Sequence, residues 1–210
     1  MATQAEETLH RCLEIILIGP VCTGKSTLAP LLADRLEVPQ VSLDQISLTY
    51  LEELGDGEAA FGNIQQELNH GEAPLRNVPQ GFLATYRQWE PFFVSAIELL
   101  LSKHFDRIID LGAGHSHYQD DGLFQRGRQA LAPYHNIVLV LPSPDLDLSV
   151  QILKERSLSQ RGYDWIADGY DFIAHWVKDR CNHELATLTV YTQDKTPQQT
   201  CDEILQCVTK

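Results

Sequence analysis

Residues Gly19–Thr27 read Gly-Pro-Val-Cys-Thr-Gly-Lys-Ser-Thr and match the pattern G-x-x-x-x-G-K-[ST]. A largely apolar run of buried-strand length precedes the match at residues 13–18. Leucines at helical spacing follow it, at positions 28, 31, 32 and 36. The motif therefore lies between an expected strand and an expected helix, which is the context in which this pattern binds phosphate. We interpret it as a phosphate-binding loop, and the alternative is a glycine-rich turn with only a structural role.

Each part of this loop has an expected task in holding a nucleotide. Gly19 and Gly24 let the backbone curl so that several N–H groups point at one oxyanion. The helix N-terminus that follows adds partial positive charge. Lys25 can reach the β- and γ-phosphates, and Ser26 can ligate Mg²⁺. The other residues expected to contact the nucleotide are Cys22, Thr23 and Thr27.

Cys22 allows two interpretations. A helix N-terminus could lower the pKa of its thiol and make it oxidisable. We favour a small residue whose backbone N–H is the group that matters.

Composition limits the class of protein. The chain has 210 residues, a hydrophobic fraction of 43% and a charged fraction of 21%, which are typical of one soluble domain. No apolar run approaches transmembrane length, and residues 1–7 are polar and acidic, unlike a secretory signal. The formal net charge of −13 argues against a nucleic-acid partner. Five cysteines without a C-x-x-C pair indicate a reduced, cytoplasmic chain.

Strand-like and helix-like patterns alternate along the chain. The strand candidates are residues 13–18, 38–43, 107–111, 137–141 and 185–191. Helical patterns lie between them, and three open at Pro91, at Ser143-Pro144 and at Thr196-Pro197, the last ending near Val208. Pro30 should bend the helix after the phosphate loop. The alternation predicts an α/β fold, with a five-stranded, mostly parallel sheet covered by helices on both faces. Ligands then bind at the carboxyl ends of the strands, where the phosphate loop lies.

Further residues follow the loop in a recognisable order. The second expected strand ends in Val-Ser-Leu-Asp at 41–44, and Tyr-Arg-Gln-Trp-Glu stands at 86–90. Ile-Ile-Asp-Leu-Gly-Ala-Gly at 108–114 ends the third strand, and Trp-Val-Lys-Asp-Arg at 176–180 precedes the last. In this order the chain resembles shikimate kinase, a P-loop small-molecule kinase of the nucleoside-monophosphate-kinase type, over most of its length. The resemblance implies the three-layer sandwich of P-loop NTPases, with ATP and Mg²⁺ as cofactors.

The resemblance also implies roles for individual residues. Asp44 would face the acceptor hydroxyl and act in catalysis beside Lys25. Arg87 and Arg180 would hold the carboxylate of the substrate. Gly112 and Gly114 would let the backbone approach the substrate. Arg161, with Arg156, would come from a lid and neutralise the transferring phosphoryl group.

Several departures from the family pattern leave the acceptor open. The second strand ends in Ser42-Leu43-Asp44 instead of Asp-x-Asp, so Asp110 could supply the outer shell of the metal instead. The family's Gly-Gly-Gly is Gly-Ala-Gly at 112–114, and the segment 45–86 looks longer than in the family. The lid reads Arg161-Gly162-Tyr163 without the expected Arg-Pro pair.

The domain expected is therefore a single kinase-like unit over residues 1–210. It carries an acceptor-side insertion at about 51–86 and a lid at about 157–169. An ordinary surface loop is the alternative for each of these two segments.

Each assigned side chain has a structural alternative. Asp44 could cap a helix over 45–54, Arg87 could form only a surface pair with Glu90, and Arg180 could be a solvated helix end. His115 and His117 flank Ser116 and could contact the acceptor. A metal site there is not expected, because two histidines have no third ligand in view.

The interpretation that these residues favour is an ATP-dependent kinase. It would transfer the γ-phosphoryl group to a hydroxyl of a small, anionic metabolite, as a monomer or homodimer with neither nucleic acid nor membrane as partner. The alternative is a nucleotide-binding regulatory NTPase that phosphorylates no metabolite. A GTPase is not indicated, because the chain has no N/T-K-x-D motif.

Overall fold

A five-stranded sheet forms the centre of the molecule. The computed structural model describes residues 14–46, 81–103 and 106–208. The sheet consists of β1 (Ile15–Ile18), β2 (Gln40–Ser42), β3 (Ile108–Asp110), β4 (Ile137–Leu141) and β7 (Leu188–Tyr191). The strand order is β2-β3-β1-β4-β7 and every neighbouring pair is parallel. Each of these strands lies within a range predicted from the sequence, so the predicted α/β fold is confirmed.

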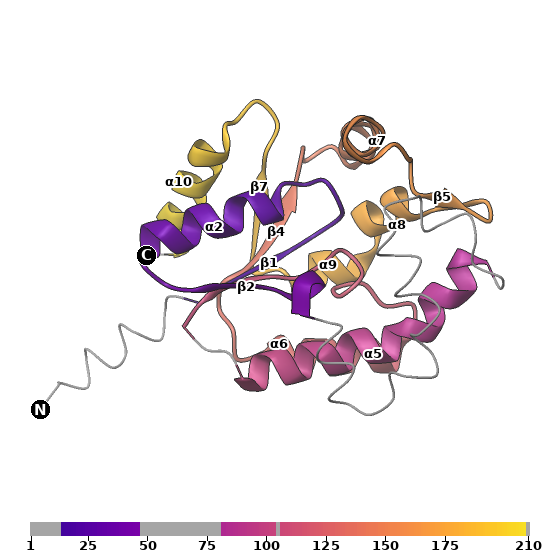
Figure 1. Ribbon diagram of the computed structural model, residues 1–210, viewed down its shortest axis with the longest axis horizontal. Coiled ribbons are helices and arrows are strands. Elements are labelled where there is room, and N and C mark those ends of the chain that lie inside the picture. The colour runs from indigo at the N-terminus through magenta and orange to yellow at the C-terminus, as the bar shows by residue number, and fades with distance from the viewer. Residues whose placement is uncertain (1–13, 47–80, 104–105, 209–210) are drawn as a thin grey trace, which may run out of the picture.

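Helices cover both faces of the sheet, as predicted. Ile15 and Leu17 of β1 pack with α2 (Lys25–Leu36) and α10 (Pro197–Val208) on one face. Ile16 and Ile18 point to the other face, against α5 (Phe82–Lys103), α6 (Asp121–Leu131) and neighbouring helices. Figure 1 shows α2 and α10 on one side of the strands and α5 and α6 on the other. The alternation follows from the two-residue period of a strand, which places successive side chains on opposite faces.

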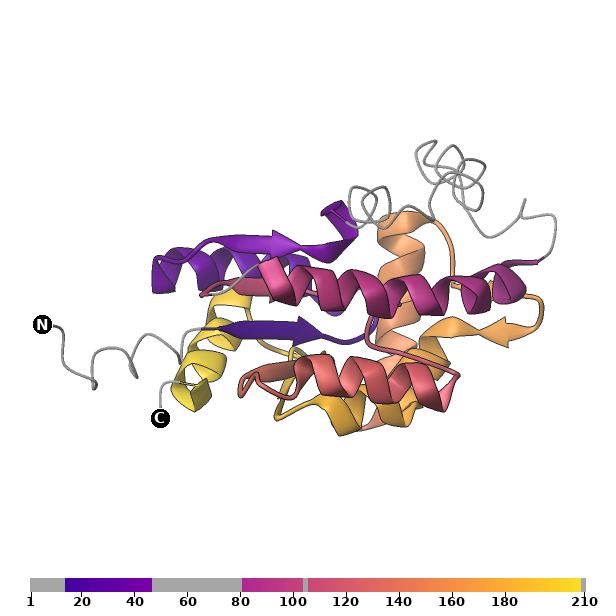
Figure 2. The same ribbon diagram turned by 90° about the horizontal axis from the view of Figure 1, so that it is seen from below.

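The parallel arrangement brings several strand ends to one edge. Figure 2 shows β1 and β2 running in the same direction, toward the part of the molecule where α7 (Leu146–Arg161) lies. The phosphate loop follows β1, Asp44 follows β2, and Asp110 ends β3. Residues distant in sequence therefore meet at the carboxyl ends of the strands.

The prediction that Pro91 opens a helix is wrong. Pro91 lies inside α5, which begins at Phe82. Proline lacks an N–H, so it removes one intrahelical hydrogen bond, but a long helix packed against a core tolerates that loss. Pro30 likewise lies inside α2, which continues to Leu36.

The region after β4 differs in detail from the sequence-based expectation. The helix predicted to open at Ser143-Pro144 begins at Leu146, because Asp145 is its N-cap and accepts from the N–H groups of Asp147 and Leu148. Residues 157–161 of the predicted lid are the last turn of α7. The rest of that range contains β5 (Ile166–Ala167), which pairs antiparallel with β6 (Tyr170–Asp171) just after it. Most of the predicted insertion, residues 51–80, lies outside the described residues, and its last residues, 82–86, belong to α5.

Three helices were not foreseen from the sequence. They are α6, α8 (Phe172–Lys178) and α9 (Arg180–Leu185). Asp120 and Asp179 cap α6 and α9 respectively, and Asp171 caps α8. Among the described helices, none combines the length and the apolar character that crossing a membrane requires.

Candidate functional site

The phosphate loop has the backbone geometry that its glycines permit. Gly19 has φ 128° and Gly24 has φ 102°, both in the region that favours glycine. A Cβ at Gly19 would lie 2.7 Å from the carbonyl oxygen of Val140 in β4, so the loop also needs glycine for close packing. Cys22 has φ 59° and is half-buried. The turn therefore holds its residues in a strained arrangement of the kind found at binding sites.

Lys25 lies buried inside this loop. Its Nζ donates to the carbonyl oxygens of Gly19 at 2.7 Å and Pro20 at 2.8 Å, and Thr23 Oγ1 also donates to Pro20 at 3.1 Å. Burial lowers the pKa of the Lys25 ammonium, an effect opposed by the negative charges of Asp110 and Asp44. The loop thus holds a cation next to two carboxylates at one edge of the sheet.

Ser26 and Asp110 form the second part of the site. Ser26 Oγ donates to Asp110 Oδ2 at 2.7 Å. The other oxygen, Asp110 Oδ1, is buried and has no hydrogen-bond partner within the described residues. Burial raises the pKa of Asp110, while Lys25 and Ser26 act to lower it. A hydroxyl beside an unsatisfied carboxylate oxygen suits Mg²⁺, which prefers oxygen ligands and retains water molecules that carboxylates can accept from.

Asp44 is held close to Gly112 and His115. A Cβ at Gly112 would lie 1.7 Å from Asp44 Oδ1, so only glycine leaves room for the carboxylate in this position. His115 Nδ1 lies 3.5 Å from the same oxygen. Burial lowers the pKa of His115, against the effect of Asp44. Leu43 is already helical, so Asp44 lies within the first turn and not at the cap position considered from the sequence.

The arginines at the end of α7 reach the phosphate loop. Arg156 donates to the carbonyl oxygen of Cys22 at 3.4 Å. The charge of Arg161 is close enough to lower the pKa of Lys25, although burial is the larger effect. The structure therefore brings both arginines close to the phosphate loop. Thr27, in the first turn of α2, is exposed.

The arginines expected to hold the acceptor lie in two different environments. Arg87 Nε donates to Gln119 Oε1 at 2.6 Å, on an exposed part of α5. Arg180 pairs with Asp121 and Glu184, and its guanidinium lies 5.1 Å from the centre of the Phe124 ring. The two arginines thus have no partner in common among the described contacts.

The alternative in which Arg87 and Glu90 form a surface pair does not fit the position of Glu90. Its side chain is buried, and both carboxylate oxygens accept from the Gln119 N–H at 3.1 Å. Glu90 therefore anchors the segment that presents Gln119 to Arg87. Gly114 lies against aromatic residues of α5, where a Cβ would approach the rings of Phe93 and Tyr86 at 3.3 Å.

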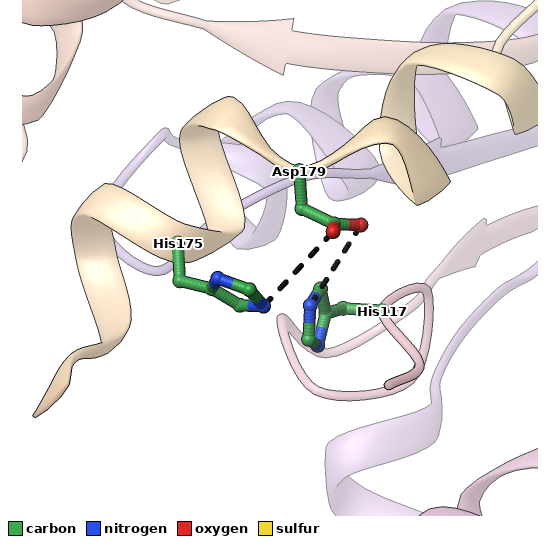
Figure 3. A group of neighbouring side chains, drawn as sticks. All are labelled: His117, His175 and Asp179. Atoms are coloured by element: carbon green, nitrogen blue, oxygen red, sulfur yellow. Dashed lines mark ion pairs between the residues drawn. The ribbon is translucent and has the colours of Figure 1, made fainter. Parts of the chain in front are cut away.

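Sequence reasoning missed a polar group formed by His117, His175 and Asp179. Figure 3 shows the three side chains facing one another, with His117 in the loop after β3 and the other two at α8 and its end. Burial lowers the pKa of His117 to about 4, with His175 acting in the same direction and Asp179 against it. Burial would raise the pKa of Asp179, but its hydrogen bonds with Cys181 and the electrostatic effect of the two histidines hold it below the usual range.

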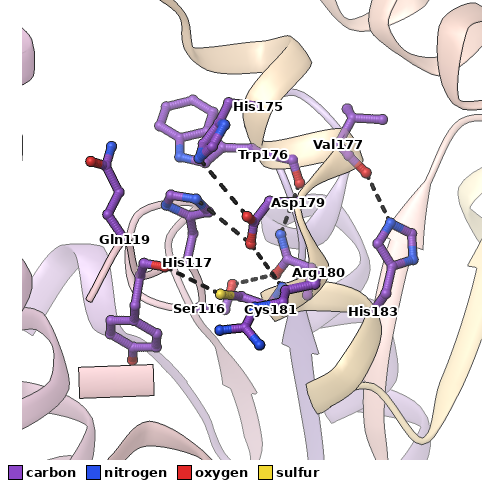
Figure 4. A network of polar contacts seen from close by, with 12 residues as sticks. Ser116, His117, Gln119, His175, Trp176, Val177, Asp179, Arg180, Cys181 and His183 are labelled. Carbon is purple, nitrogen blue, oxygen red and sulfur yellow. Dashed lines mark hydrogen bonds and ion pairs between the residues drawn. The ribbon is translucent and has the colours of Figure 1, made fainter. Parts of the chain in front are cut away.

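Hydrogen bonds also connect α8 and α9 to the loop after β3, which carries His117. Ser116 Oγ donates to Asn182 Oδ1 at 2.7 Å, and Asn182 Nδ2 donates to the carbonyl oxygen of Trp176 at 3.0 Å. Cys181 Sγ lies 3.4 Å from the carbonyl oxygen of Tyr118 (Figure 4). The only signal in the sequence was the i, i+4 spacing of His175 and Asp179, which does not indicate His117 as a neighbour.

Substituting Gly112 with alanine should disable the site without unfolding the protein. The added Cβ would lie 1.7 Å from Asp44 Oδ1 and 2.7 Å from His115 Nδ1, so it must displace the Asp44 carboxylate, whose side chain is 65% exposed. A displacement of about 1 Å can cost on the order of a hundredfold in rate. We expect turnover to fall by about that factor while ATP binding, measured by calorimetry, stays close to wild type. Gly122→Ala on exposed α6 is the matched control, and equal turnover in both variants would contradict the assignment.

Comparisons with known proteins identify the fold. At the level of sequence, neither a protein-family model nor a curated protein matches the chain. Structural matches are extensive. A shikimate kinase from Acinetobacter baumannii in complex with shikimate is similar at a TM-score of 0.58 and 15% identity, covering 97% of this chain and 96% of that one. The fold is that of the shikimate kinases.

Two further solved structures place this fold among small-molecule kinases. A shikimate kinase from Bacteroides thetaiotaomicron has a TM-score of 0.54 and 16% identity, over 94% of this chain and 99% of its own. A gluconokinase from Sinorhizobium meliloti 1021 has a TM-score of 0.51 and 14% identity, over 95% and 93%. The predicted resemblance is confirmed at the level of fold. Identities this low carry no information about the acceptor.

Proposed function

We propose that this protein is an ATP-dependent kinase that phosphorylates a hydroxyl of a small, anionic metabolite. The observation that carries the proposal is the meeting of Lys25, Ser26–Asp110 and Asp44 at one edge of the sheet. Phosphoryl transfer needs positioning and charge neutralisation more than covalent chemistry, and these residues offer both. The shikimate kinase and gluconokinase neighbours share the fold on which such chemistry occurs.

Each residue has a role in this proposal. Lys25 leaves the carbonyls of Gly19 and Pro20 to contact the β- and γ-phosphates. Asp44 orients the acceptor hydroxyl and accepts its proton. Ser26 would hold Mg²⁺ directly and Asp110 through water, and the ion would neutralise charge on the phosphates. Gly112 and Gly114 leave space for the acceptor beside the backbone.

Arg156 and Arg161 extend this charge neutralisation to the transferring group. Both belong to α7, whose end contacts the phosphate loop at Cys22. Arg161 is exposed and is the last residue of α7, within the predicted lid. We propose that residues 157–169 close over bound nucleotide, exclude water and bring Arg161 to the phosphates.

The acceptor is expected to be anionic because two arginines of the protein, Arg87 and Arg180, are proposed to hold it. A chain with a formal charge of −13 attracts a small anion only through a local basic site. Arg87 is presented toward Gln119 and Tyr170, whereas Arg180 must first leave Asp121 and Glu184. Both remain in the proposal, and Arg87 has the more favourable position.

Arg87→Lys should therefore raise the KM for the acceptor about ten- to a hundredfold, because lysine cannot reproduce a bidentate contact. The KM for ATP should stay nearly unchanged. Arg128→Lys, an exposed arginine of α6, serves as the control. Steady-state kinetics measure both KM values, and an unchanged KM for an anionic acceptor in Arg87→Lys would refute this role.

A panel of acceptors tests the proposed function itself. ATP consumption should be stimulated by at least one hydroxy acid, sugar acid, sugar or nucleoside, with a stoichiometric phosphorylated product seen by mass spectrometry. If nucleotide binds and no acceptor is phosphorylated, the regulatory NTPase is the better description.

The described cysteines at 22, 181, 201 and 207 are all free, which supports a cytoplasmic location.

A further inference from the structure

His117, His175 and Asp179 converge from two parts of the chain. One ligand atom from each residue lies within 4.8 Å of those of the other two. His117 Nε2 lies 3.7 Å from Asp179 Oδ1, and His175 Nε2 lies 4.0 Å from Asp179 Oδ2 (Figure 3). Each of the two imidazoles therefore directs its Nε2 atom toward the Asp179 carboxylate.

Both of these nitrogens are buried and lack a hydrogen-bond partner within the described residues. Buried polar atoms are nearly always hydrogen-bonded, and leaving one unsatisfied is costly. His117 is the extreme case, because only 1% of its side chain is exposed. Two such atoms aimed at one carboxylate indicate that a further group belongs between them.

Neighbouring residues orient the histidine and the carboxylate. His117 Nδ1 lies 3.3 Å from Tyr86 Oη, which also accepts from Trp176 Nε1 at 3.3 Å. If the Tyr86 hydroxyl donates to the carbonyl oxygen of Gly114, His117 Nδ1–H donates to Tyr86 and its Nε2 keeps a lone pair. Asp179 Oδ1 accepts from the Cys181 N–H at 2.8 Å. Such outer contacts are the usual means of fixing the ligands of a metal ion.

We propose that His117, His175 and Asp179 bind a divalent transition-metal ion of the Zn²⁺ class. Imidazole and carboxylate suit Zn²⁺ and its neighbours, whereas Mg²⁺ and Ca²⁺ prefer sites made of oxygen alone. Bonds of about 2.0–2.2 Å place neighbouring ligand atoms about 3.3–3.6 Å apart in a tetrahedral site. The ligand atoms lie within 4.8 Å of one another, with 3.7 Å between His117 Nε2 and Asp179 Oδ1, so the side chains must move inward to bind the ion.

The proposed site is separate from the phosphate-binding site. It shares no residue with Ser26 and Asp110, which are suited to Mg²⁺. The His175 and Asp179 side chains are 33% and 20% exposed, so the ion enters from their side while His117 closes the inner side. Three protein ligands leave a coordination position for water or another oxygen ligand. The ion would also join the loop after β3 to the α8–α9 junction.

The test uses the full chain, stripped with a chelator and kept free of nucleotide and Mg²⁺. Cys12, Cys22 and Cys207 are replaced by serine so that thiols do not bind the probe. Co²⁺ titration followed by visible absorption, and Zn²⁺ titration by calorimetry, should each give one equivalent. Zn²⁺ should also raise the Tm, since an ion that binds only the folded state stabilises it.

His175→Asn should weaken Zn²⁺ binding at least about tenfold, since even outer-shell substitutions commonly cost 10- to 100-fold. Asp179→Asn should do the same while keeping a residue that can cap α9. His135→Asn, at an exposed position outside the group, should bind as tightly as the parent. Equal affinity in all variants, or absence of a single stoichiometric site in the parent, would overturn the proposal. Neither result depends on kinase activity.

Discussion

Replacing Lys25 with alanine should remove most of the rise in Tm that Mg²⁺ and ATP cause in the wild-type protein. A ligand that binds only the native state raises the melting temperature, and Lys25 is the cation of the loop that reaches the phosphates. The side chain is buried and hydrogen-bonded to Gly19 and Pro20, so it is already held inside the loop. Phosphoryl transfer should fall by about 10²–10³, the loss typical of removing one preorganised charge-stabilising group.

The control for this experiment separates binding from folding. Lys25→Ala leaves two loop carbonyls without a donor, so its Tm without ligand must be measured first. Lys25→Met keeps much of the apolar stem and serves as a second variant. Lys195→Ala removes a lysine that pairs with Glu203 on the surface of α10, and should behave as wild type. An unchanged ATP-induced Tm shift in both Lys25 variants would remove the main argument for nucleotide binding.

Asp44→Asn should lower turnover by about 10²–10⁴ with little effect on ATP affinity. That range is the usual contribution of a positioned general base. A loss in kcat and kcat/KM together, without a change in nucleotide binding, identifies an interaction made mainly in the transition state. Asparagine has nearly the same shape as aspartate, so the packing against Gly112 and His115 is kept.

Stopped-flow or steady-state kinetics with the acceptor found in the panel provide the measurement. Asp34→Asn, at an exposed position of α2, is the matched control. Full turnover in Asp44→Asn would show that the carboxylate has no part in the chemistry. The proposal would then retain only its phosphate-binding half.

The parts of this protein that were predictable from the sequence depend on local patterns. The loop Gly19–Thr27 is contiguous, and the strand before it is a short apolar run that is recognisable from its own residues. Asp110 was a candidate for the outer shell of the metal because it ends an apolar strand, and ligands bind at the carboxyl ends of such strands. Its hydrogen bond with Ser26 agrees with that reasoning.

Other features depended on contacts between distant segments. Pro91 reads as a helix start because proline is favoured there, but packing of α5 against the sheet extends the helix on both sides of it. Arg180 pairs with Asp121 on α6, a helix that the sequence did not reveal. The ion-pair partner of a long side chain depends on how the elements pack, so the spacing of residues along the chain does not predict it.

The sequence by itself determined the phosphate loop, the alternation of strands and helices, and hence the edge of the sheet at which ligands bind. Tertiary structure alone decided that Gly112 makes room for Asp44, and that His117 meets His175 and Asp179. The physical reason is range. Backbone propensity and hydrophobic period act over a few residues, whereas a site of three side chains requires the loop after β3 and the end of α8 to be brought together by the packed core.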